Sequence, residues 1–232
     1  MKRLYTYIRE GSVLLIALAL ALTTSCSFDE QVDPNRPSLE GVLTDASVNQ
    51  LNNLVVGVES AMRNSLAIQT TGSGTIAREL YLFDADPRNT GDLLGANGSN
   101  LDNNSFYSTA PWAGRYRAIK NANILLQSVE NTSAVTDAQK AGYRGFAKTI
   151  IAYELIEVLK SYDRARVDVA DPENLGPILG FSEALSAVRS LLDDAQTDLN
   201  GAGSEFAFAL AGFSGFDTPS TFGQFNRAVA AT

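Results

Sequence analysis

Apolar residues recur every three or four positions in several segments of the chain, with polar residues between them. This spacing places the apolar side chains on one face of an α-helix. The first such segment, residues 46–66, has its apolar stripe at Val48, Leu51, Val55, Val58, Met62 and Leu66. We therefore predict an amphipathic helix over residues 46–66.

Two further helices are predicted at residues 112–130 and 136–163. Thr136 and Gln139 have the spacing of a capping box, which marks the start of the second of these helices. The apolar stripe of that helix is expected to pack in the core rather than to form a ligand site. The stripe consists of Tyr143, Phe146, Ile150 and Tyr153.

A fourth helix is predicted from Ser182, as its N-cap, to Gly201. A fifth is predicted after Thr218, with Pro219 as its first residue. The apolar pattern of the fifth helix continues to Thr232 without a glycine cap or a proline. We therefore expect the sequence to be the N-terminal portion of a longer, helical protein.

Antiparallel helix pairs joined by variable loops predict an all-α fold over residues 44–232. Its expected form is a tetratricopeptide-like α-solenoid with long loops, here truncated. Residues 164–181 break the helical pattern with two prolines, and residues 69–111 form a long polar stretch rich in Gly, Asn and Asp. Irregular stretches of this length within compact domains are usually functional or disordered. The polar stretch is thus the first place to look for a binding site.

Composition excludes several classes of function. The 232-residue chain has a formal net charge of -8, no histidine and one cysteine. Nucleic acid is not expected as a partner, because such binding depends on Lys and Arg that neutralise phosphates. The absence of histidine excludes histidine triads and histidine metal sites, and a single cysteine excludes an intramolecular disulfide and a cysteine zinc cluster. We expect no cofactor and no metal site.

The N-terminus has the pattern of an export signal. Lys2 and Arg3 precede an apolar run at residues 13–22, which is too short to span a bilayer, and Cys26 follows soon after. The pattern resembles a bacterial lipoprotein signal, in which residues 1–25 are removed and Cys26 carries a diacylglycerol and an acyl chain such as palmitate. An ordinary signal peptide and a short membrane anchor are the alternatives. Residues 26–43 are predicted to form a lipidated, extended tether.

The mature chain resembles the SusD/RagB outer-membrane lipoproteins, over the N-terminal portion of that family. The resemblance rests on CSFDEQVDPNRPS, LDNNSFYSTAPWAGRYRAIKNANILL, YRGFAKTIIAYELI and GFDTPSTFGQFNRAVAA, in that order. Its more specific parts are the pattern W-x-x-x-Y-x-x-I-x-x-A-N, from Trp112 to Asn123, and the RGFAKTIIAYEL helix. Many members continue that helix with a YGDVP turn, whereas this chain has SYDRARVDVADPENLGP.

The resemblance implies a protein that is lipid-anchored in the cell outer membrane, exposed on the surface, and not an enzyme. Such a protein binds glycans or other nutrients and delivers them to a TonB-dependent, SusC-like transporter. The acidic SFDEQVDP segment resembles the export tag of Bacteroidetes-type surface lipoproteins, with a solvated linker as the alternative. Two other functions stay open: a helical protein–protein interaction scaffold without a ligand site of its own, and a carboxylate glycosidase.

Sugar binding requires aromatic faces for the rings, and amides, carboxylates or guanidinium groups for the hydroxyls. The stretch that ends at Trp112 offers these groups, and it is expected to contribute to a ligand site. The alternative is that Trp112 and Tyr81 pack in the core, while the Asn and Asp residues form turns. The candidate ligand-binding residues are Arg78, Tyr81, Arg88, Asn89, Asp92, Asn97, Asn103, Tyr107 and Trp112.

Neighbouring carboxylates could form a glycosidase pair or a calcium site. None of them has EF-hand spacing, and a glycosidase pair is defined by a separation in space that sequence does not give. Solvated helix faces and turns are the expected roles for these residues. The groups are Asp84 with Asp86, Asp168 with Asp171 and Glu173, and Asp193 with Asp194.

Overall fold

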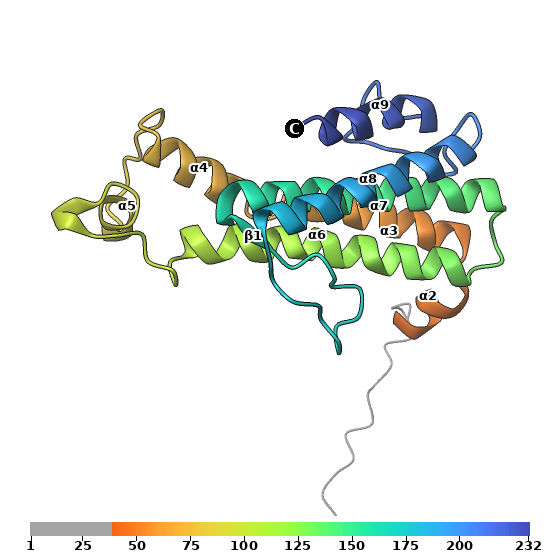
Figure 1. Cartoon of the computed structure of the whole chain (residues 1–232), viewed down its shortest axis with the longest axis horizontal. Coiled ribbons are helices and arrows are strands. Elements are labelled where there is room, and N and C mark those ends of the chain that lie inside the picture. Colours follow the sequence, from red (N-terminus) through yellow and green to blue (C-terminus); the bar gives the residue numbers. More distant parts are fainter. Residues whose placement is uncertain (1–38) are drawn as a thin grey trace, which may run out of the picture. The chain divides into compact units, whose positions relative to one another are not determined.

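The computed structural model describes residues 39–232, which are mostly helical, and it confirms the predicted all-α class (Figure 1). The predictions for residues 1–38, including the signal peptide and the lipidation of Cys26, lie outside the described residues. The helices are α2 (Leu39–Asp45), α3 (Val48–Ala61), α4 (Leu66–Ile76), α5 (Pro87–Gly91), the 3-10 helix η1 (Ala96–Gly98), α6 (Phe106–Asn131), α7 (Asp137–Tyr162), α8 (Phe181–Gly201) and α9 (Pro219–Ala230). Two short strands, β1 (Arg164–Ala165) and β2 (Leu179–Gly180), pair in antiparallel fashion.

The longer helices pack against one another largely in chain order. Helix α3 contacts α6, α6 contacts α7, α7 contacts α8, and α8 contacts α9. Helices α6 and α7 have 26 residues each and form an αα-hairpin, because only the short connection 132–136 separates them (Figure 1). Neighbour-to-neighbour packing is compatible with an α-solenoid, but the tetratricopeptide-like form of the solenoid stays a prediction.

Helix α7 supplies much of the core. Tyr143, Phe146 and Ile150 of its predicted stripe are fully buried, and Tyr153 is half-buried with its ring 6.2 Å from that of Phe225 on α9. The prediction that this stripe is core is confirmed. The close approach of α8 also requires a small residue on α7: a Cβ added at Gly145 would lie 2.6 Å from Leu199 Cγ.

A cluster of phenylalanine rings attaches α9 and the loop before it to α7. Phe146 on α7 lies 5.5 Å from both Phe208 in the loop and Phe222 on α9, measured between ring centroids. Phe213 adds an edge contact to Phe222 at 5.3 Å. Such aromatic pairs add stability beyond the area that they bury, so they hold the loop close to the helices.

Local capping signals account for several helix starts. The predicted capping box of Thr136 and Gln139 begins α7, and Thr218 caps α9 with Pro219 at its first position, as predicted. The predicted start of α8 is wrong by two residues. Its N-cap is Gly180 rather than Ser182, because the β1–β2 pairing places Gly180 at the end of a strand and the helix follows at once.

Two segments that we predicted to be irregular contain helices. Residues 39–43, expected as the end of the tether, belong to α2, which buries Val42 and contacts α6. The polar stretch 69–111 contains most of α4, all of α5 and the first turns of α6. Helix α6 begins at its cap, Ser105, and carries Pro111 inside it, so Trp112 lies within the helix rather than at its start.

Candidate functional site

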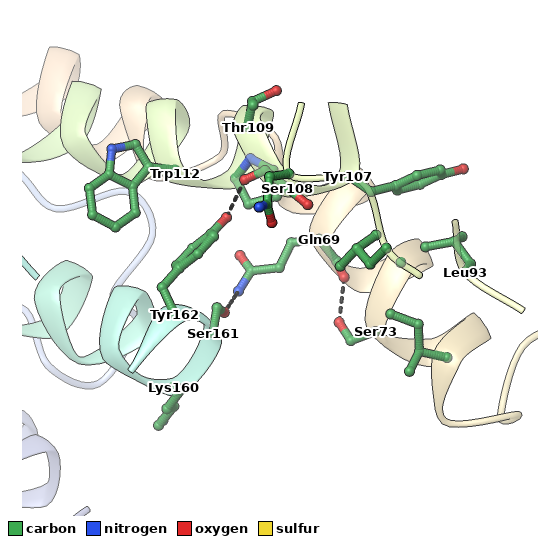
Figure 2. A pocket seen from close by; sticks show the side chains of 15 residues that line it. Gln69, Ser73, Leu93, Tyr107, Ser108, Thr109, Trp112, Lys160, Ser161 and Tyr162 are labelled. Carbon is green, nitrogen blue, oxygen red and sulfur yellow. Dashed lines mark hydrogen bonds between the residues drawn. The ribbon is translucent and has the colours of Figure 1, made fainter. Parts of the chain in front are cut away.

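A cleft of about 650 Å³ lies between α4, the first turns of α6 and the end of α7. Figure 2 shows Trp112 and Tyr162 on one side of it and the side chains of α4 on the other. Gln69 and Ser73 come from α4, and Lys160, Ser161 and Tyr162 come from the last turn of α7. The cleft therefore joins segments that are distant in the sequence.

Aromatic rings form one wall of the cleft. The ring of Trp112 lies 5.1 Å from that of Tyr162 in an edge-on contact and 4.8 Å from that of Tyr116. The Tyr162 hydroxyl donates a hydrogen bond of 2.6 Å to the backbone carbonyl of Ser108, as Figure 2 shows. Burial raises the pKa of Tyr162, so its phenol stays protonated and keeps this bond at neutral pH. The ring wall is therefore fixed before any ligand arrives.

Neutral polar groups form the other side of the cleft. The Gln69 side-chain amide donates to Ser161 Oγ at 3.3 Å, and Ser73 Oγ donates to the Gln69 backbone carbonyl. Asn103, which also lines the cleft, makes no side-chain hydrogen bond within the described part of the chain. Lys160 lies at the cleft edge and pairs with Glu157, Nζ to Oε1 2.9 Å. The cleft thus presents amides and hydroxyls beside an already paired cation.

A buried charge network supports this polar side from below. Arg115 on α6 donates to Gln69 Oε1 through Nε at 3.2 Å and through Nη2 at 2.6 Å. Its Nη1 lies 2.9 Å from Glu154 Oε2 on α7, and the two side chains are 6% and 0% exposed. Because Arg115 holds the amide oxygen of Gln69, the amide nitrogen is directed to Ser161. Arg115 therefore orients one of the groups that line the cleft.

Glu154 has an unusual environment for a carboxylate. Burial raises its pKa from 4.5 to about 7, although the charge and hydrogen bond of Arg115 act in the opposite direction. Its Oε1 has no hydrogen-bond partner within the described residues. Sequence reasoning missed Arg115 and Glu154, yet one signal was present: Glu154 continues the buried stripe of Phe146 and Ile150 at a four-residue step.

Of the nine candidate residues, Asn103, Tyr107 and Trp112 line the cleft. Trp112 is half-buried and packs against the core, and it also lines the cleft, so its role in ligand binding stays a prediction. Sequence reasoning did not find Gln69, Ser161 and other cleft residues of α4 and α7, because no motif connects these helices to the stretch before Trp112.

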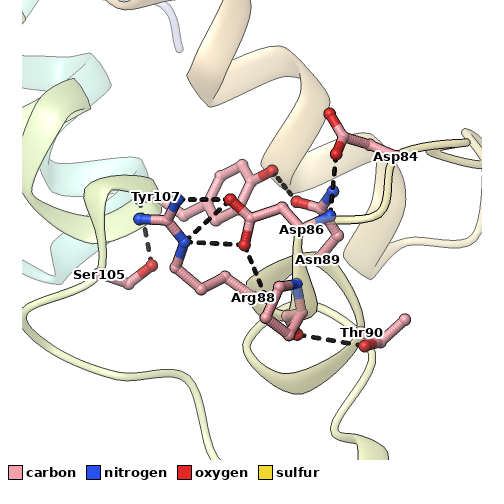
Figure 3. A network of polar contacts seen from close by, with 8 residues as sticks. Asp84, Asp86, Arg88, Asn89, Thr90, Ser105 and Tyr107 are labelled. Atoms are coloured by element: carbon pink, nitrogen blue, oxygen red, sulfur yellow. Dashed lines mark hydrogen bonds and ion pairs between the residues drawn. The ribbon is translucent and has the colours of Figure 1, made fainter.

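Arg88 and Asn89 have structural partners instead (Figure 3). The Tyr107 hydroxyl donates to Asn89 Oδ1 at 2.5 Å, and Asn89 is only 3% exposed. The Arg88 guanidinium donates to Asp86 and lies 4.7 Å above the ring of Phe106. Hydrogen bonds from Arg88 hold the pKa of Asp86 at about 2. These contacts attach α5 to the start of α6.

The remaining four candidates, Arg78, Tyr81, Asp92 and Asn97, do not line the cleft. Arg78 and Asn97 have positive φ values of 64° and 58°, which fits turn positions. Tyr81 is 72% exposed, so it does not pack in the core either. Its ring lies 4.7 Å from that of Phe83, which is 92% exposed.

The acidic groups serve turns and ion pairs. Asp84 Oδ1 accepts from the backbone N–H of Asp86, and Asp171 Oδ1 accepts from that of Glu173, each at 2.9 Å. Asp193 pairs with Arg227 at 2.7 Å. Within residues 39–232, no group of three His, Cys, Asp or Glu side chains is arranged to hold a metal ion.

In the same range, no helix combines the length and apolar character that crossing a membrane requires.

The pattern that carries the family resemblance lies on one helix, since Trp112, Tyr116, Ile119 and Asn123 all belong to α6. Ile119 is fully buried, whereas Trp112 and Tyr116 are half-buried beside the cleft wall. Comparisons of the chain with protein-family models, with curated proteins and with solved structures found no match.

Proposed function

We propose that this chain is a surface lipoprotein of the SusD type that binds a neutral glycan in the cleft beside Trp112. Cys26 carries the lipid anchor, and the bound glycan passes to a TonB-dependent, SusC-like transporter. The observation that carries the proposal is the composition of the cleft, in which the rings of Trp112 and Tyr162 face the amide and hydroxyl groups of Gln69 and Ser161.

The chemistry of the cleft favours sugars over other small ligands. Aromatic faces pack against the C–H faces of sugar rings, and amides and hydroxyls bond the sugar hydroxyls. The volume of about 650 Å³ lies in the usual range for small-ligand sites. Lys160 is already paired with Glu157, so the cleft offers no free cation for an anionic group. A neutral oligosaccharide therefore fits better than an acidic one.

Binding is tested by titrating the full chain with neutral oligosaccharides while the fluorescence of Trp112 is recorded. Trp112 is the only tryptophan and it lines the cleft, so its emission reports ligands there. Because Trp112 also lines a second hollow along α6, the Ser161→Ala variant is needed to assign the signal to the cleft. At least one glycan should change the emission, and Ser161→Ala should weaken its binding about tenfold, which corresponds to one lost hydrogen bond of about 1.4 kcal/mol. Ser190→Ala, an exposed serine on α8, should have no effect.

A failure of every neutral glycan to bind would contradict the proposal. Equal binding to the Ser161→Ala variant and to the unmodified chain would place any observed ligand elsewhere. Release of reducing sugar ends during the titration would indicate a glycosidase, and we expect none.

The exposed rings of Tyr81 and Phe83 favour a second function, contact with a protein partner. Two exposed aromatic rings in contact are typical of protein interfaces rather than of free surface. Because neither ring lines the cleft, the variant Tyr81→Ser with Phe83→Ser should reduce co-purification with the transporter and leave glycan binding unchanged. Unchanged co-purification would exclude these rings from the interface.

A further inference from the structure

A second hollow also has Trp112 in its lining but shares no other residue with the cleft. It has a volume of about 480 Å³ and lies between α2, α6 and the loop that joins β1 to β2. Figure 1 shows α2 and this loop on the same side of α6. We call this hollow the α6 groove.

One face of α6 forms the floor of the α6 groove. Trp112, Tyr116, Lys120 and Ile124 all line it and follow one another at four-residue steps. With a rise of 1.5 Å per residue, these positions extend over about 18 Å. The floor therefore suits an elongated ligand with an apolar or aromatic body.

The walls of the α6 groove are apolar and held in place by hydrogen bonds. Leu43 of α2 lies on one side, and Val169 of the loop lies on the other. The Tyr116 hydroxyl accepts from the backbone N–H of Arg166 at 2.7 Å and donates to the Arg166 carbonyl at 3.1 Å. The Arg166 guanidinium closes the loop by donating to the Gly176 carbonyl at 2.6 Å. The hollow thus exists without a ligand.

Two cations line the α6 groove, Lys120 and Arg166. Neither forms an ion pair with any residue of the described range. The acidic residues of the same loop, such as Asp168 and Asp171, do not line the groove. Because the chain as a whole carries a net charge of -8, two cations without acidic partners in an apolar hollow mark a site for an anion.

We propose that the α6 groove binds an amphipathic carboxylate, a small molecule with an extended apolar body and one anionic end. The carboxylate contacts Lys120 and Arg166, and the apolar body lies along α6 between Leu43 and Val169. A volume of about 480 Å³ matches a small-ligand site, which is mostly apolar with a few polar groups that set orientation. This site shares Trp112 with the glycan cleft, but none of its other lining residues lines that cleft, and the proposal does not rest on glycan binding.

The test compares dodecanoate, kept below its critical micelle concentration, with its uncharged analogue dodecanamide, kept below its solubility limit. Each is titrated into the full chain by calorimetry. Dodecanoate should bind at least about tenfold more tightly than the amide, because only the acid contacts the two cations. Lys120→Ala should weaken dodecanoate binding by about tenfold and leave the amide unchanged. Arg117→Ala removes an exposed α6 cation that does not line the groove, and it should change neither affinity.

A second measurement locates the ligand. In a methyl NMR spectrum, dodecanoate should shift Ile124 and Val169 of the groove but not Ile76 of the glycan cleft. Equal affinities for acid and amide, no binding of either, or shifts confined to Ile76 would each overturn the proposal. Ser161→Ala should leave dodecanoate binding unchanged, so failure of the glycan proposal and failure of this one give different results.

Discussion

Arg115 on α6 and Glu154 on α7 form an ion pair of 2.9 Å whose two side chains are almost entirely buried. Glu157 is a second, more distant partner, with its carboxylate 4.0 Å from Arg115. Because Arg115 also holds the Gln69 amide, this single guanidinium connects α4, α6 and α7 beneath the cleft. Removal of either charged partner should therefore affect the stability of the helices and the shape of the cleft together.

The first prediction concerns this pair. At pH 8, Arg115→Leu should lower the free energy of unfolding by about 3–5 kcal/mol, because it leaves the Glu154 carboxylate buried without its partner. The double variant Arg115→Leu with Glu154→Leu should lose clearly less, since both buried charges are gone. Urea unfolding of Arg115→Leu, Glu154→Leu and the double variant measures the coupling energy between the two side chains. If the losses of the two single variants simply add up in the double variant, the side chains do not stabilise each other and the prediction is wrong.

The second prediction concerns pH. The pKa of Glu154 is about 7 in the folded chain, above its ordinary value of 4.5. Between pH 4.5 and pH 7, the folded chain therefore keeps a proton on Glu154 that the unfolded chain has released. The contribution of Glu154 to stability is complete below about pH 4.5 and falls by about 2–3 kcal/mol as the pH rises to about 7. Glu154→Gln should remove this component from the pH profile of the unfolding free energy. Parallel profiles for the two proteins would exclude Glu154 as its source.

The third prediction concerns the contact between α7 and α8. Gly145→Ala places a methyl group 2.6 Å from Leu199 Cγ and 3.1 Å from the Leu199 backbone nitrogen, so the helices must separate. We expect a loss of about 1–3 kcal/mol in unfolding free energy. The control is Gly201→Ala on α8, where the added Cβ would lie 3.9 Å from Ala141 Cβ and stability should not decrease.

The fourth prediction separates structural from ligand-binding roles near α5. Tyr107→Phe removes the hydrogen bond to Asn89, whose amide oxygen is then buried without this donor. Thermal or urea unfolding should show a loss of about 1–3 kcal/mol. Tyr81→Phe, at an exposed position, should be neutral. Equal stability of both variants would show that the Tyr107–Asn89 bond does not hold α5.

The fifth prediction concerns the proposed lipid anchor. Cys26→Ala removes the thiol to which lipid would be attached, so the chain should leave the membrane fraction and lose labelling by radioactive palmitate. Cell fractionation and labelling of both proteins measure this. Membrane retention of the variant would contradict lipidation at Cys26.

Helices with strong local signals were predictable. The start of α7 was predictable from Thr136 and Gln139, and the start of α9 from Thr218 and Pro219. Capping side chains bond backbone groups only a few residues away, so their pattern is visible in the sequence. Helix α4 was missed, since Gly72, Gly74 and its threonines are poor helix formers. Its formation depends on packing against α6, which no local pattern reveals.

The cleft was predictable only in part, for a related reason. Tyr107 and Trp112 lie in the stretch whose composition indicated sugar binding, so residue type alone pointed to them. Gln69 and Ser161 reach the same space from α4 and α7, and their meeting is a result of tertiary packing. Arg88 was predicted as a ligand-binding residue because the sequence does not reveal its partner. In the fold it forms an ion pair with Asp86 and does not line the cleft.

The weak local signals of α4 have a consequence for binding kinetics. Ser65 precedes α4 in a left-handed conformation without a side-chain cap, and α4 packs mainly on α6. We therefore expect this wall of the cleft to open more readily than the walls on α6 and α7. The opposite wall, formed by the rings of Trp112 and Tyr162, is rigid. A ligand would therefore enter and leave through motions of α4, and the rate of its release would follow how often α4 frays.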